Sequence, residues 1–168
     1  GNTTPAAVAM AKRFRDAGFP EKDIFVGGPV PKKHNMVVRY RGKGGPGAPK
    51  PVLLLAHLDV VEALKADWSD NLDPFKFTER DGFYYGRGTA DDKAMASLFV
   101  AAAIRLKKEG YVPQRDIIIA LTTDEEGGAY NGVDWLLKNH RELMDAAWVI
   151  NEGGGGALRD GKPLLHSM

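Results

Sequence analysis

One histidine and six carboxylates in this sequence either follow an apolar run or precede a segment with helical spacing. They are His57, Asp59, Asp91, Asp92, Glu125, Glu126 and Glu152. Because the arrangement recurs at several run ends, we expect these side chains to meet at one place. Carboxylates packed together would cost several kcal/mol unless a cation neutralised them. Histidine and carboxylates are ligands for divalent metal ions, so the residues predict a metal centre.

The number of carboxylates also indicates what such a centre would do. One zinc ion needs fewer ligands than these, so we expect two metal ions about 3.5–4 Å apart with one carboxylate bridging them. Glu125 and Glu126 are adjacent, so one can bind metal while the other stays free. A free glutamate beside a metal-bound water can act as a general base. This is the chemistry of hydrolysis.

Each residue also has a purely structural interpretation, which the residues alone leave open. His57 could be a satisfied histidine at a strand end, and the acids 124–126 could form a solvated turn. Asp91 and Asp92 could cap the helix that follows them. A cap needs only one carboxylate, so the second would remain available for a cation.

Strands and helices alternate in the segments that would position these residues. Helical spacing is present in three segments, 5–17, 94–109 and 133–144. Strands are expected at 23–26, 35–41, 51–57, 116–121 and 147–150, with a short strand pair around 75–78 and 83–85. We predict an α/β fold with a mostly parallel, twisted sheet and helices on both of its faces. Open sheets of this class bind ligands at the carboxyl ends of their strands.

The composition is that of an ordinary globular chain. Of its 168 residues 43% are hydrophobic and 27% are charged, and the formal net charge of +1 gives no reason to expect a nucleic-acid or membrane partner. The chain has no cysteine, so a metal ion must be held by His, Asp and Glu. No apolar run approaches membrane-spanning length and no signal peptide is visible. The compartment is left open.

Five segments, in order, resemble the signature segments of one family of di-zinc metallopeptidases. The segments are HLDVV (57–61), W-x-x-x-x-DPF (68–75), DGFYYGRGTADDK (81–93), TTDEEGG (122–128) and NEGGG (151–155). The family includes glutamate carboxypeptidase, aminoacylase, acetylornithine deacetylase, succinyl-diaminopimelate desuccinylase and carnosinase-like dipeptidases. The resemblance covers residues 52 to 156.

The resemblance implies a set of metal ligands. His57 and Glu152 would bind one zinc ion, Glu126 would bind the second, and Asp91 would bridge the two. The peptide bond between Asp91 and Asp92 would be cis. Co²⁺ or Mn²⁺ could replace Zn²⁺, and we expect the position held by His57, Asp91 and Glu152 to be the better occupied.

The resemblance also implies catalytic roles. Glu125 would be the general base that deprotonates the bridging water and later gives the proton to the leaving amine. Asp59 would orient His57, because its carboxylate is close enough in sequence to accept the second ring N–H. The family's activity would be hydrolysis of an amide bond in a small peptide or an N-acyl amino acid, of carboxypeptidase or dipeptidase type.

A non-catalytic metal-binding relative or a regulatory protein is the alternative function. Glu125 separates the two hypotheses, because a binding protein needs the ligands but has no use for a free glutamate beside them. Its presence favours the enzyme.

One family feature has no counterpart in this chain. The second zinc ion's histidine lies far downstream in the family, after a lid domain that carries dimer contacts. His166 comes too soon to replace it, and we expect His34 and His140 to be surface residues. We therefore expect residues 1–168 to be the N-terminal portion of one catalytic domain, inactive alone, from a protein that dimerises through the missing lid domain. The start without Met and the end soon after a glycine-rich segment agree with this, and a targeting segment could precede it.

Overall fold

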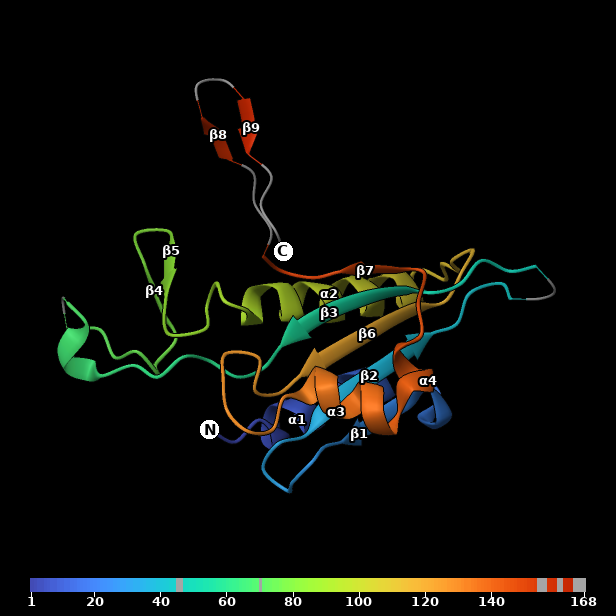
Figure 1. Ribbon diagram of the computed structural model, residues 1–168, viewed down its shortest axis with the longest axis horizontal. Coiled ribbons are helices and arrows are strands. Elements are labelled where there is room, and N and C mark those ends of the chain that lie inside the picture. Colours follow the sequence, from blue (N-terminus) through green and yellow to red (C-terminus); the bar gives the residue numbers. More distant parts are fainter. Residues whose placement is uncertain (45–46, 70, 154–156, 160–161, 165–168) are drawn as a thin grey trace.

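A five-stranded mixed sheet organises the computed structural model (Figure 1). The structure describes residues 1–44, 47–69, 71–153, 157–159 and 162–164, so His166 lies outside the described residues. The strand order is β1-β2-β6-β3-β7. The strands are β1 (Ile24–Gly27), β2 (Asn35–Tyr40), β3 (Val52–His57), β6 (Ile117–Thr122) and β7 (Trp148–Ile150).

Strand β3 pairs in parallel with both β6 and β7. Strand β2 pairs antiparallel with both β1 and β6, so β2 alone runs against the other four strands of this sheet. The predicted mostly parallel α/β sheet is confirmed in this sense. Ile118 and Ile119 in β6 are completely buried, as expected for a β-branched run covered on both faces.

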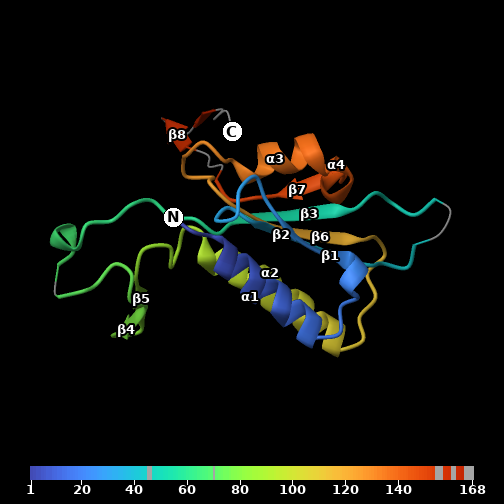
Figure 2. The ribbon, with the colours of Figure 1, turned by 90° about the horizontal axis from the view of Figure 1, so that it is seen from below.

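Helices cover both faces of the sheet, as predicted (Figure 2). On one face lie α1 (Thr4–Asp16) and α2 (Lys93–Lys108), and on the other lie α3 (Gly132–Asn139) and α4 (Arg141–Met144). In α1 the buried residues Ala7, Ala11 and Phe14 recur at helical spacing and join one core cluster with β2 and β6. Within the described part of the chain, no helix is both long and apolar enough to cross a membrane.

Two predicted boundaries were wrong. The helix expected over 133–144 is divided at His140, whose non-helical backbone (φ −145°, ψ 44°) separates α3 from α4. The His140 ring packs 4.7 Å from Phe25 and 5.0 Å from Trp135, between ring centroids, which places it partly under the surface. The early strand pair forms β4 (Thr78–Arg80) and β5 (Phe83–Tyr85). Strand β4 starts later than expected because the amides of Phe75 and Lys76 bond to Asp73 in a turn.

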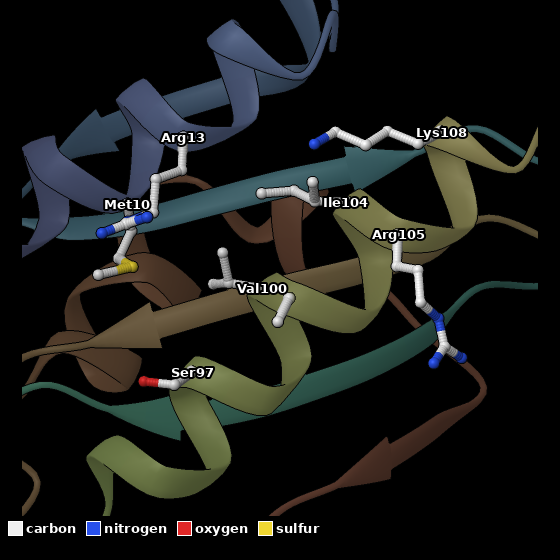
Figure 3. A pocket seen from close by; sticks show the side chains of 8 residues that line it. Met10, Arg13, Ser97, Val100, Ile104, Arg105 and Lys108 are labelled. Carbon is white, nitrogen blue, oxygen red and sulfur yellow. The ribbon is translucent and has the colours of Figure 1, made fainter.

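A hollow of about 550 Å³ lies between α1 and α2 (Figure 3). Its lining combines apolar with cationic side chains, namely Met10, Arg13, Ser97, Val100, Ala101, Ile104, Arg105 and Lys108. None of these is among the site residues predicted from the sequence.

A second hairpin, β8 (Ala157–Arg159) with β9 (Lys162–Leu164), follows β7 and was not predicted.

Candidate metal centre

His57 is the last residue of β3 and is 1% exposed. Its Nδ1 lies 3.0 Å from the main-chain carbonyl oxygen of Asp59. A carbonyl oxygen can only accept a hydrogen bond, so Nδ1 carries the proton and Nε2 is the nitrogen left for a ligand. Nε2 lies 2.8 Å from Asp91 Oδ1 and 2.9 Å from Glu152 Oε1. A lone pair facing two carboxylates requires a cation between them, either a proton or a metal ion.

The register of the parallel strands brings these residues to one edge of the sheet. His57 pairs with Thr122, so β3 and β6 end at the same level. Ile150 in β7 pairs with Leu54, so Glu152, two residues later, comes level with the end of β3. Asp91 reaches the same place from the segment that precedes α2.

Two groups of possible ligands share His57 within the described residues. In each group the ligand atoms lie within 4.8 Å of one another, and the groups are His57, Asp92 and Glu152, and His57, Asp91 and Glu126. All four ligands predicted from the sequence are therefore brought together. Sequence reasoning did not assign Asp92 as a ligand, and it placed Glu152 with His57 and the bridging Asp91 rather than with Asp92.

Asp92 is at the N-cap position of α2 but does not cap the helix through its side chain. It is 2% exposed, and its Oδ2 accepts a hydrogen bond from the main-chain N–H of His57 at 3.1 Å. Burial raises the pKa of this carboxyl above its ordinary value. The peptide bond between Asp91 and Asp92 is cis, as the family resemblance implies. The signal that could have found Asp92 is the second carboxylate, which a helix cap does not need.

The charges at the centre favour an added cation. Burial alone would lower the pKa of His57, but the neighbouring carboxylates of Glu152, Asp91 and Asp59 raise it above the ordinary 6.5. Burial, and then repulsion from Asp92, Asp91 and Glu125, raises the pKa of Glu152. The carboxylates of this centre therefore repel one another and attract positive charge, as the raised pKa of His57 shows.

The Asp59 side chain contacts a different partner from the one we expected. Its carboxylate is 3.7 Å from His57 Nδ1, whereas its oxygens accept the main-chain N–H groups of Glu125 and Glu126 at 3.1 Å each. The expectation that this carboxylate accepts the ring N–H is thus corrected, because the Asp59 carbonyl oxygen occupies that position. Asp59 contacts His57 through its main chain and the segment after β6 through its side chain.

Glu125 and Glu126 differ in their relation to the centre. Glu126 belongs to one of the two ligand groups. Glu125 belongs to neither, its side chain is 47% exposed, and its Oε2 lies 3.9 Å from His57 Nε2. His34 and His140 also lie outside both groups.

Comparison with known proteins agrees with this geometry. The model of peptidase family M20/M25/M40 matches residues 53–162, which include every residue of the two ligand groups. The chain belongs to peptidase family M20/M25/M40. Members of this family are metallopeptidases and related amidohydrolases.

Relatives of this family-M20 chain include two curated enzymes. It is 38% identical over 127 residues to N-fatty-acyl-amino acid synthase/hydrolase PM20D1 of Bos taurus, covering 72% of this chain and 25% of that protein. It is 36% identical over 104 residues to aminoacylase-1 of Sus scrofa, covering 61% of this chain and 25% of that protein. The chain thus spans about a quarter of the length of these relatives.

The fold of the family-M20 chain is also found in solved structures. Human carnosine dipeptidase 1 superposes with a TM-score of 0.64 at 20% sequence identity, over 88% of this chain and 32% of that one. At this identity the likeness establishes the α/β fold alone.

Proposed function

We propose that this chain forms the first part of the catalytic domain of a zinc-dependent hydrolase that cleaves amide bonds. The observation that carries the proposal is the position of His57 Nε2, which lies within 2.9 Å of both the Asp91 and Glu152 carboxylates. Three such groups at the carboxyl edge of a sheet form an incomplete cage for a divalent ion.

The residues present fit two metal ions. His57 and Glu152 would hold one and Glu126 the other, with Asp91 between them, since its oxygen faces His57 and it shares a group with Glu126. Imidazole together with carboxylates suits Zn²⁺, and Co²⁺ or Mn²⁺ could substitute for it. A bound zinc ion polarises a carbonyl group and lowers the pKa of water to about 7.

Glu125 is suited to proton transfer. Its carboxylate is close to His57 but outside both ligand groups, and it is accessible to a substrate. It would accept a proton from the attacking water and return it to the nitrogen of the leaving amine. The bond between the carbonyl carbon and that nitrogen then breaks, which releases a carboxylic acid and an amine.

The substrate class follows from the family. The names of the relatives describe an N-fatty-acyl-amino acid hydrolase, an aminoacylase and a carnosine dipeptidase. We therefore assign this site a small peptide or an N-acyl amino acid, with carboxypeptidase or dipeptidase action. The missing histidine of the second zinc ion and the lid domain, through which two copies would associate, would come from elsewhere in the complete protein.

Hydrolysis by the complete protein, with and without a zinc chelator, tests the assignment. We expect chelator-sensitive turnover of some members of a panel of dipeptides and N-acyl amino acids. Inactivity across the panel despite bound zinc would favour the non-catalytic metal-binding relative. Absence of bound metal in the complete protein would exclude the assignment as a metallohydrolase.

Substitutions at two adjacent residues of the complete protein distinguish the general base from the metal ligand. Glu125→Gln should lower kcat by about 10²–10⁴-fold while zinc content stays the same, because only the proton acceptor is lost. Glu126→Gln is the matched control, which should lose zinc together with activity. Zinc content is measured by elemental analysis, and normal turnover by Glu125→Gln would exclude Glu125 as the base.

A further inference from the structure

Three acids are adjacent at the end of β6, and each has a different environment in the structure. Glu126 faces the metal centre and Glu125 lies beside it. Asp124 instead forms an ion pair with Lys33, and both side chains are largely buried, with exposed fractions of 4% and 14%. Lys33 lies outside residues 53–162, the segment matched by the family model. The pair therefore separates one of the three acids from the metal centre.

We propose that Lys33 is a positioning residue for the acidic loop, defined as residues 124–126. Through Asp124, it fixes the main chain on which Glu125 and Glu126 are carried. The catalytic part of this inference rests on the proposed function, whereas the positional part concerns only the loop.

The acidic loop is held from both of its sides. On the side of the metal centre, the Asp59 carboxylate accepts the N–H groups of Glu125 and Glu126. On the other side, Lys33 binds the Asp124 side chain and Asn131 Nδ2 donates to the Asp124 carbonyl at 3.2 Å. Movement of Asp124 would therefore disturb both bonds to Asp59.

The backbone of Asp124 makes this second anchor necessary. Its φ of +51° lies in the left-handed region, which is uncommon for a residue with a side chain and persists only where surrounding contacts enforce it. The conformation turns the chain sharply between β6 and Glu125. The bond to Lys33 is one of the contacts that hold it.

Lys33 is itself rigidly placed. A Cβ on Gly28 would come within 1.8 Å of the Lys33 carbonyl oxygen, so the two ends of the loop between β1 and β2 approach closely there. The Lys33 N–H donates to Val30 O at 2.9 Å. The Thr3 N–H donates to Lys32 O in the same loop at 3.0 Å, and the Thr3 hydroxyl donates to Thr123 Oγ1 at 2.9 Å. The ammonium group is thus presented to Asp124 from a fixed position.

The positive charge of Lys33 compensates the buried negative charge of Asp124. Without Lys33, the buried Asp124 carboxylate would lie unpaired beside two further acids, and an uncompensated buried charge is strongly unfavourable. The hydrogen bond to Asp124, together with attraction from Asp124 and Asp59, raises the pKa of Lys33 although burial opposes it. Lys33 therefore stays charged, and it keeps Asp124 paired with a cation other than the metal ion.

The test uses four variants of the complete protein and one control. Lys33→Met keeps the apolar stem and removes the charge, Lys33→Arg keeps the charge, and Asp124→Asn removes the other partner. The double variant Lys33→Met/Asp124→Asn removes both. Lys32→Met is the matched control, because Lys32 is an exposed neighbour.

The first measurement is hydrogen exchange at the amides of Glu125 and Glu126. We expect exchange there to be about tenfold faster in Lys33→Met and in Asp124→Asn, since local opening of the loop becomes easier. Hydrogen exchange at the buried amides of α1 and β2 should be unchanged. In Lys32→Met, exchange should be unchanged throughout the chain. Lys33→Arg should restore most of the protection. Unchanged exchange at the two amides in Lys33→Met, or an equal increase throughout the chain, would overturn the proposal.

The second measurement is steady-state kinetics on the best substrate found for the complete protein. Misplacement by about 1 Å can cost 10²-fold in rate, so we expect kcat to fall by about 10–100-fold in Lys33→Met with KM within about threefold. The double variant should be no slower than Lys33→Met, because both changes act through one contact. Wild-type kcat in Lys33→Met would overturn the catalytic part. If the wild-type protein turns over nothing while the two amides still respond, the proposed function fails and the positional role stands.

Discussion

The main-chain carbonyl of Asp59 determines which nitrogen of His57 can bind a metal ion. Because that oxygen accepts the Nδ1 proton, Nε2 is directed toward Asp91 and Glu152. The orientation does not depend on a side-chain charge, since the bond is to the main chain. A single residue, Asp59, therefore connects the imidazole on one strand end with the acidic loop on the next.

Protons and metal ions should compete at His57. Its raised pKa in the metal-free state means that protonation begins above pH 6.5, and a protonated imidazole cannot bind metal. Below that raised pKa, metal affinity should fall about tenfold for each unit by which the pH is lowered, because the metal ion must displace one proton from His57. Calorimetric zinc binding over a pH series measures this. His34→Gln is the control that should keep the same profile, and pH-independent affinity across the series would contradict the prediction.

At the scale of elements, Asn35 joins β2 to the acidic end of β6. It is completely buried, its Oδ1 accepts the Thr123 N–H at 3.1 Å, and its Nδ2 donates to Gly27 O at 3.2 Å. Gly132, the first residue of α3, packs so closely that a Cβ there would be 2.0 Å from Asn35 Oδ1. Strand and helix therefore meet around one amide group just before the acidic loop.

Asn35→Ala should lower the free energy of unfolding by about 1–3 kcal/mol, because it leaves the buried Thr123 N–H without a partner. Asn139→Ala is the matched control. Its side chain bonds to Trp135 O on the exposed side of α3, and surface changes cost within about 0.5 kcal/mol. Urea unfolding followed by circular dichroism measures both, and equal losses in the two variants would refute the role of Asn35.

At the scale of the whole molecule, β7 forms an exposed apolar edge in the part of the chain that the structure describes. Trp148, Val149 and Ile150 are 68%, 57% and 52% exposed, and among the described strands β7 pairs only with β3. An apolar sheet edge with free main-chain groups can pair with another chain. We therefore expect the 168-residue chain, prepared alone, to associate as its concentration rises.

Val149→Lys should reduce this association, because a lysine on an edge strand opposes pairing with a second strand. Light scattering over a concentration series compares the variant with the parent chain. Val8→Lys, at an exposed position of α1, is the control that should leave association unchanged. Equal association of all three chains would show that β7 is not the contact.

The same 168-residue chain should lack full hydrolytic activity. Its described residues supply one histidine to both ligand groups, and it spans about a quarter of the length of two enzymes that it resembles. We expect turnover of the best substrate only from the complete protein, measured at equal zinc concentration. Turnover by the 168-residue chain at the rate of the complete protein would contradict this.

The sequence by itself determined the fold class and the ligands expected at the centre. Apolar runs such as 116–121 predicted buried strands because burial on both faces requires continuous apolar residues. The acids that follow them predicted metal chemistry because adjacent carboxylates need a cation. Apolar runs and adjacent acids are local features, so they can be recognised from the spacing of residues along the chain.

Tertiary structure alone decided which groups meet. Asp92 bonds to the His57 amide, the Asp59 carboxylate binds the acidic loop, and Lys33 pairs with Asp124 across 91 positions of sequence. The ring of His140, where the predicted helix is divided, likewise packs against Phe25 in a distant strand. Such contacts arise from the register and packing of separate elements, and no local pattern of residues specifies them.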